Sequence, residues 1–120
     1  MEKLKQTIVA ASLIGEYGIT LDDGRAVFRI IHPLLQQGNT VILDFQDVKL
    51  FASPFLNASI GQLFNHFSLD FIQENFIPIN MSNVGENTMR QVMKNANDYY
   101  NNPLTREAVD RVLAEQCAID

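Results

Sequence analysis

The sequence predicts an α/β fold in which helices pack on a small sheet that is mostly parallel or mixed. The run from Thr40 to Phe45 is short, apolar and partly β-branched, as expected of a central strand buried on both faces. On either side of it, apolar residues recur at intervals of three and four, which is typical of amphipathic helices. Strands that alternate with helices over short connections favour parallel pairing. A length of 120 residues suits one domain, so we assign residues 1–120 to a single domain.

The first third of the chain predicts a strand followed by a helix. Residues Thr7 to Ile14 are apolar and partly β-branched, as in a strand. Thr20 is a favoured N-cap, and the helix after it has a buried stripe made of Val27, Ile30, Ile31, Leu34 and Leu35. Pro33 removes a backbone donor, so we expect it to kink this helix near Arg29 or to split it before Gly38.

After the central strand, a loop over residues 46–52 is expected to lead into a second helix. Ser53 is a favoured N-cap and Pro54 is favoured at the first helical position, so the helix should begin there. Its buried face consists of Phe55, Leu56, Ser59, Ile60, Leu63, Phe64 and Phe67. Gly61 weakens this helix by about 1 kcal/mol relative to alanine. We expect that a glycine stands here because the helix approaches the sheet closely.

The last part of the chain predicts one strand and two helices. Phe76 to Asn80 is typical of a short strand, and Pro78 favours a position at the edge of the sheet. Ser82 or Asn83 begins the next helix, whose expected buried stripe is Met89, Val92, Met93, Ala96 and Tyr99 or Tyr100. Pro103 should end that helix, and Thr105 should begin a final one.

Charge and composition argue against several classes of function. Fourteen acidic residues against nine basic ones give a net charge of -5, which disfavours binding to nucleic acid or to an anionic membrane surface. No apolar run approaches the roughly 20 residues that span a bilayer. Two lysines precede the first apolar segment, but Glu16 follows it without a clear cleavage site. We therefore expect a cytoplasmic protein with no membrane partner and no nucleic-acid partner.

Residues that would carry catalysis or bind metals are sparse. Cys117 is the only cysteine, so a disulfide within the chain is excluded, and the only histidines are His32 and His66. These residues are too few for the usual zinc or iron ligand sets, so we expect no metal and no cofactor. No nucleophile elbow, phosphate-binding loop or dinucleotide fingerprint occurs, and we expect no catalytic residues and no enzymatic activity. We interpret the neighbouring Asp22 and Asp23 as first-turn helix charges rather than as a paired-carboxylate site.

One stretch of the chain carries a family pattern. A strand ends in Leu43, Asp44 and Phe45, Val48 follows in the loop, and Ser53 precedes the Phe-Leu pair that opens a helix with an internal glycine. This stretch, residues 40–64, resembles STAS-like domains, the bacterial relatives of the STAS domains of anti-sigma-factor antagonists. The resemblance implies an α/β fold and a regulatory role that is exerted on a protein partner.

The same resemblance bears on phosphorylation. In antagonist STAS domains, a partner kinase phosphorylates a serine where this loop meets the helix, within a sequence of the type Asp-Ser-Ser-Gly. The corresponding residues here are Ala52, Ser53, Pro54 and Phe55. Pro54 stands at the position of the phosphorylated serine, and Ala52 replaces the acidic neighbour. We therefore expect that the switch has been lost and that Ser53 acts mainly as the helix cap.

The resemblance implies a non-enzymatic interaction module whose docking surface is the loop and helix start around residues 47–57. We expect this surface to be acidic and to bind a protein partner, either a kinase-like ATPase or a transcription regulator. The residues expected to contact the partner are Asp47, Ser53, Phe55 and Asn57. The aromatic stripe of the helix is expected to be core, although a dimer surface, and hence a homo-oligomer, stays open.

A second hypothesis is a sensor that binds a small ligand or nucleotide. Open α/β sheets place their ligand crevice at the carboxyl ends of the strands, and Asp44, Asp47 and Ser53 follow the central strand there. Against this, a carboxylate directly after a strand often accepts hydrogen bonds from a turn. We favour that structural interpretation for Asp44, and a solvated loop position for Asp47.

Overall fold

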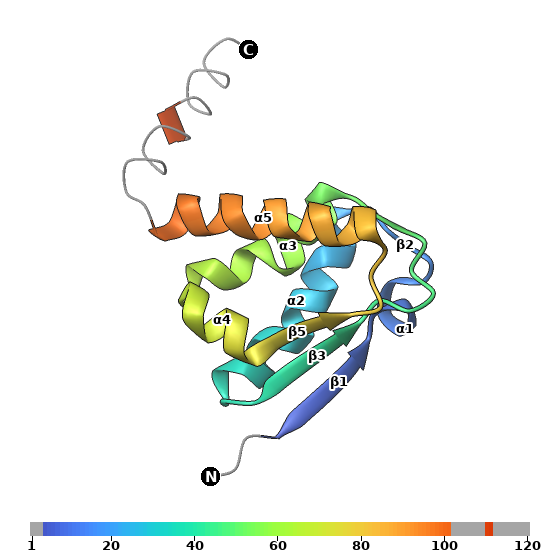
Figure 1. Cartoon of the computed structure of the whole chain (residues 1–120), viewed down its shortest axis with the longest axis horizontal. Coiled ribbons are helices and arrows are strands. Elements are labelled where there is room, and N and C mark those ends of the chain that lie inside the picture. Colours follow the sequence, from blue (N-terminus) through green and yellow to red (C-terminus); the bar gives the residue numbers. More distant parts are fainter. Residues whose placement is uncertain (1–3, 102–109, 112–120) are drawn as a thin grey trace.

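The computed structural model describes residues 4–101 and 110–111, and its centre is a parallel three-stranded sheet (Figure 1). The strands are β1 (Lys5–Val9), β3 (Thr40–Asp44) and β5 (Phe76–Ile79), in the order β1-β3-β5. Both strand pairs are parallel, with Thr7 beside Ile42 and Ile42 beside Ile77. The predicted α/β fold is confirmed, and the strand that begins at Thr40 lies at the centre of the sheet as predicted. Pro78 lies in an edge strand, also as predicted.

The two faces of the sheet differ in burial. Val41, Leu43 and Phe45 point to the inner face and are buried. On the outer face, Ile42 is half-buried and Ile77 stays exposed. The prediction that the central strand is buried on both faces therefore holds for one face only. Helix α2 (Leu21–Gln36) contacts β3 and lies behind the sheet in Figure 1.

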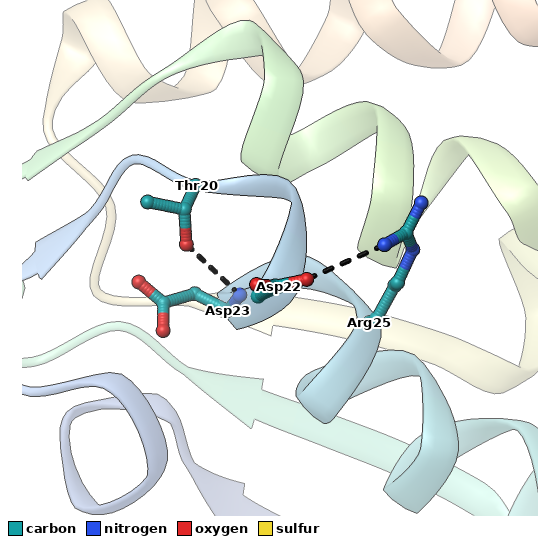
Figure 2. A network of polar contacts seen from close by, with 4 residues as sticks. All are labelled: Thr20, Asp22, Asp23 and Arg25. Atoms are coloured by element: carbon teal, nitrogen blue, oxygen red, sulfur yellow. Dashed lines mark hydrogen bonds and ion pairs between the residues drawn. The ribbon is translucent and has the colours of Figure 1, made fainter.

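The start of α2 follows from local side-chain chemistry. The hydroxyl of Thr20 accepts a hydrogen bond of 3.1 Å from the backbone N–H of Asp23, so the predicted N-cap is confirmed (Figure 2). Asp22 and Asp23 lie in the first turn, where a negative charge interacts favourably with the helix dipole. Arg25 approaches Asp22 to 3.3 Å at the surface, so these carboxylates are helix-start charges as interpreted.

The end of α2 is set by glycine rather than by proline. The helix is continuous from Leu21 to Gln36, so Pro33 does not split it. Pro33 has no N–H and so cannot make its own helical hydrogen bond, and it lies in the last turn, where little of the helix remains to be disturbed. Gly38 has φ 87°, and its N–H donates to the carbonyl of Leu35 while the N–H of Asn39 donates to that of Leu34. This pair of bonds is a Schellman motif, which needs a residue with positive φ after the helix.

The first apolar segment is shorter as a strand than predicted. Only β1 is extended, and Ala10–Ile14 form the short helix α1. The last residue of β1, Val9, pairs with Asp44 at the end of β3, so no neighbouring strand continues beyond it. The predicted strand is confirmed for Thr7 to Val9, but its continuation to Ile14 was wrong, because an apolar run without alternation does not distinguish strand from helix.

A second parallel pair lies beyond the carboxyl end of the sheet. It joins β2 (Tyr17–Gly18) to β4 (Leu50–Phe51), and we call it the ribbon. The N–H of Lys49 donates to the carbonyl of Glu16, and the N–H of Ala52 donates to that of Gly18. Residues 46–52 were expected to be loop, so the short β4 within them was missed.

The aromatic-rich helix predicted from Ser53 to Phe67 is broken into two pieces. Helix α3 (Ser53–Ser59) is followed by the 3₁₀ helix η1 (Gly61–Asn65), and α4 (Leu69–Asn75) begins after the N-cap Ser68. The buried Ser59 hydroxyl donates to the carbonyl of Phe55 at 2.8 Å, an interaction that tends to bend helices. The glycine that follows at position 61 adds little helix propensity, so the break falls there.

The remaining helix, α5 (Asn83–Asn101), packs on α3 and η1 (Figure 1). The hydroxyl of Ser82 accepts from the N–H of Gly85 at 3.0 Å, as expected of the residue that begins the helix. Met89, Val92 and Ala96 are buried, which confirms the predicted stripe. The predicted helix end at Pro103 and the predicted final helix from Thr105 lie outside the described residues. None of the described helices has the length and apolar character needed to cross a membrane.

Helices α2 and α3 approach each other at glycine. A Cβ atom at Gly24 would lie 2.5 Å from the carbonyl oxygen of Phe55 and 2.7 Å from the Cβ of Ala58. At Gly61, where a close approach to the sheet was predicted, a Cβ would meet Asn57 and α5 at ordinary distances of 3.5 Å or more. The close approach therefore occurs between helices and at Gly24, and the prediction for Gly61 was wrong.

Candidate functional site

Asp44 closes the carboxyl end of the sheet through hydrogen bonds. Its Oδ1 accepts from the backbone N–H of Gln46 at 2.9 Å and from the side-chain amide of Asn80 at 2.8 Å. Asn80 follows β5 and has φ 61°, so two neighbouring strand ends are joined by this carboxylate. The structural interpretation of Asp44 as a turn acceptor is confirmed.

These contacts make the ionisation of Asp44 testable. The amide of Asn80, and next the N–H of Gln46, hold the pKa of Asp44 below its ordinary value. A lowered pKa contributes stability that is present above the unfolded value and is lost as the pH falls through the folded one. We expect a carboxyl NMR titration to give a low pKa for Asp44 and a higher one in Asn80→Gly, which removes the donor but tolerates the positive φ. The control Asn87→Ala should leave the pKa of Asp44 unchanged. If the pKa of Asp44 is also unchanged in Asn80→Gly, the hydrogen bond from Asn80 is not what lowers it.

Asp47 and Ser53 lie at different places from Asp44. Asp47 is exposed and has φ 69°, a conformation that aspartate tolerates, in the turn where the N–H of Val48 donates to the carbonyl of Phe45. Ser53 faces α5, as described below, whereas the Asp44 side chain is bonded to Asn80. No hydrogen bond of the described residues joins any two of the three side chains suggested for a ligand crevice.

Ser53 is not the N-cap of α3. The carbonyl of Ala52 accepts the first helical bond, from the N–H of Leu56 at 3.1 Å, so Ala52 is the cap residue and Ser53 is the first helical residue. No side-chain cap bond forms at this helix start. The ribbon explains the shift, because its pairing continues to the N–H of Ala52 and the helix begins directly after it. The prediction that Ser53 caps the helix was wrong, and its hydroxyl is exposed.

The other two predicted contact residues differ in burial. Phe55 is 0% exposed and belongs to the core, so its side chain is not part of any docking surface. Asn57, two residues later, is exposed. A helix that packs on one side and faces solvent on the other separates neighbouring positions in this way. Of the four predicted contact residues, Asp47, Ser53 and Asn57 are at the surface.

Ser53 and Asn57 form one wall of a polar groove between α3 and α5. The groove has a volume of about 360 Å³, and its other polar residues all come from α5: Asn87, Thr88, Gln91 and Asn95. Asn87, Gln91 and Asn95 are spaced by four, so they form one row on the helix. The amide of Gln91 donates to Asn95 at 3.0 Å. An uncharged row of this kind both donates and accepts hydrogen bonds.

A second hollow adjoins the polar groove at its far end. It has a volume of about 440 Å³ and shares Asn57 and Asn95 with the groove. Its other lining residues are Gly61, Gln62, Ala96, Asp98, Tyr99 and Tyr100. We call it the tyrosine hollow, because the two tyrosines lie at the end of α5 with their ring centroids 4.9 Å apart.

The ribbon presents apolar side chains beside the start of α3. Tyr17 and Leu50 are paired across it and are 51% and 54% exposed. Glu16 and Lys49 form an exposed ion pair of 3.5 Å next to them. Residues 47–57 therefore carry one acidic and one basic side chain, Asp47 and Lys49, so the prediction of an acidic surface was wrong.

Two histidines far apart in the sequence lie side by side. The rings of His32 in α2 and His66 after η1 are 4.7 Å apart, with Phe28 and Phe67 against them. Sequence reasoning treated the two separately and missed this pair, because it depends on how α2 packs on η1. Within residues 4–101 and 110–111, no three His, Cys, Asp or Glu side chains are grouped so that they could hold a metal ion.

Comparison with protein-family models gave a match. A family model described as a STAS-like domain of unknown function (DUF4325) matches residues 23–86, more than half of the chain. The chain belongs to this family. The STAS-like match covers nearly all of α2, the central strand, α3 and β5, and it includes Ser53 and Asn57. It ends at residue 86, so all the α5 residues that line the polar groove and the tyrosine hollow lie beyond it. Comparison with curated proteins and with solved structures gave no match.

Proposed function

We propose that this STAS-like protein is a cytoplasmic, non-enzymatic regulatory module that docks a protein partner. The docking surface consists of the exposed residues Tyr17, Leu50, Ser53 and Asn57, with Asp47 at its border. The observation that supports it best is the exposed apolar pair Tyr17 and Leu50 directly before the helix start that carries Ser53. In the STAS domains that the chain resembles, partners act at this junction.

The chemistry of this surface suits a protein more than a small molecule. Protein interfaces combine an apolar centre with a polar rim that supplies hydrogen bonds. Here Leu50 and Tyr17 would form the centre, and Ser53, Asn57 and the ion pair of Glu16 with Lys49 would form the rim. The kind of partner that the family resemblance favours is a kinase-like ATPase or a transcription regulator.

We do not expect phosphorylation of Ser53 to control docking. Pro54 carries no hydroxyl, and Ala52 supplies no acidic neighbour for Ser53. Ser53 itself makes no cap bond, so its hydroxyl contributes little to folding. Partner binding is then constitutive, or it is controlled by the state of the partner.

Affinity purification of the tagged full chain from its native host tests this surface. We expect Leu50→Lys to retain at least tenfold less partner than the unaltered chain, because it places a charge at the apolar centre. Ser53→Ala should keep partner affinity within a few fold. Leu4→Lys is the matched control, since Leu4 is also exposed but precedes β1 at the opposite end of the sheet. If Leu50→Lys and Leu4→Lys retain equally reduced amounts of partner, the proposed surface is contradicted. Stoichiometric phosphate on Ser53 that abolishes partner binding would contradict it as well.

A further inference from the structure

The tyrosine hollow has the dimensions of a small-molecule site. Pockets that enclose such ligands usually measure about 300–1,000 Å³, and this one measures about 440 Å³. Two of its lining residues are small, since Gly61 has no side chain and Ala96 has only a methyl group. The side-chain Oδ1 of Asn57 lies 3.5 Å from where a Cβ of Gly61 would be.

Three uncharged amides determine what the hollow can recognise. Asn57, Gln62 and Asn95 each offer a donor and an acceptor, so together they match a ligand edge that also carries both. The bond from Gln91 to the Oδ1 of Asn95 fixes that side chain and leaves its NH₂ group as a donor. The side chain of Asn57 makes no hydrogen bond within the part of the chain that the structure describes.

The charge of the hollow selects against anions. Among the described residues that line the hollow, Asp98 is the one carboxylate, and none of them is Lys, Arg or His. A ligand with a phosphate would meet a like charge with no compensating cation. Ligand hydroxyl groups, by contrast, donate well to a carboxylate, as the ribose hydroxyls do in dinucleotide sites.

The tyrosines add a surface for a planar ring. The rings of Tyr99 and Tyr100 meet edge to face at 82°. The Tyr99 hydroxyl donates to Asp110 at 2.7 Å, and the Tyr100 hydroxyl approaches Gln62 at 3.5 Å. These contacts orient the rings, whose faces can stack on an aromatic ligand.

We propose that the tyrosine hollow binds a nucleobase or nucleoside that carries no phosphate. The base stacks on a tyrosine ring, its hydrogen-bonding edge pairs with the amides of Asn57 and Asn95, and the sugar hydroxyls donate to Asp98. This site does not depend on the proposed docking function, since the ligand is bound by this chain alone.

Titration of the purified full chain with single nucleosides tests the site directly. Adenosine, guanosine, cytidine and uridine are added one at a time, and binding is followed by calorimetry and by NMR shifts of the side-chain amides. We expect saturable binding of at least one nucleoside, with shifts at Asn57 and Asn95, and at least tenfold weaker binding of its 5′-monophosphate. Asp98→Asn should narrow that difference because it removes the like charge.

Matched variants separate this site from non-specific binding. Asn95→Ala should weaken nucleoside binding about tenfold, whereas Asn97→Ala, on the side of α5 that faces α4, should leave it within twofold. Absence of saturation by all four nucleosides at millimolar concentration overturns the proposal. So does a monophosphate that binds as tightly as its nucleoside, or equal losses in the two asparagine variants. None of these outcomes bears on partner docking, which is measured separately.

Discussion

Replacement of Phe55 by alanine should lower the free energy of unfolding by about 3–5 kcal/mol. The Phe55 side chain is fully buried, and a Cβ atom at Gly18 would lie only 3.1 Å from its ring. Truncation leaves a cavity between α3 and the ribbon that the surrounding backbone cannot fill. Equilibrium unfolding in denaturant, monitored by circular dichroism, measures the loss directly.

The control for this experiment lies five residues earlier. Leu50→Ala removes a side chain that is 54% exposed and should change the free energy of unfolding by about 0.5 kcal/mol or less. Phe55→Leu, which keeps most of the volume, should fall between the two variants. A loss below about 1 kcal/mol in Phe55→Ala would mean that this ring is not part of the core and would restore it as a candidate partner contact.

The parts of the fold that sequence reasoning predicted are those determined by local chemistry. The apolar run from Thr40 specifies a strand by itself, and Thr20 and Ser82 stand where a helix needs an acceptor for its first free N–H groups. Pro78 has no N–H to donate, which restricts it to an edge strand in any arrangement. None of these predictions required knowledge of distant neighbours.

The parts that failed depend on neighbours distant in the sequence. Strand β4 has two residues and exists only because the segment after Glu16 lies beside it. Strand β1 ends at Val9 because β3 ends at Asp44, a limit that the apolar run through Ile14 does not reveal. Ser53 fits a cap by residue type, but the ribbon has already used the N–H of Ala52 and moved the helix start by one residue.

The candidate sites were only partly visible in the sequence. Ser53 and Asn57 were chosen from their position in the family pattern, and they do lie together in the polar groove. The amides opposite them come from α5, and only the packing of α5 on α3 reveals that they face this wall. A signal was nevertheless present, because Asn87, Gln91 and Asn95 repeat at intervals of four on one helix.

A second large loss of stability is expected from Gly24→Ala. In most helices this change stabilises by about 1 kcal/mol through helix propensity. Here the added methyl would lie 2.5 Å from the carbonyl oxygen of Phe55 and 2.7 Å from the Cβ of Ala58, both in α3. Neither atom belongs to a flexible side chain, so α2 and α3 have to separate. We expect a net decrease of about 2 kcal/mol in the free energy of unfolding, measured by denaturant titration.

Gly61→Ala is the matched control for this change, since both glycines are buried in helical segments. Its methyl would meet Asn57 at 3.5 Å and Ala96 at 3.7 Å, which are ordinary contact distances. Gly61→Ala should therefore be neutral or more stable by up to about 1 kcal/mol. The free energy of unfolding is expected to fall in Gly24→Ala and not in Gly61→Ala only if α2 and α3 touch at Gly24. An increase in stability in both variants would show that helix propensity alone determines the effect and that α2 and α3 are further apart than described.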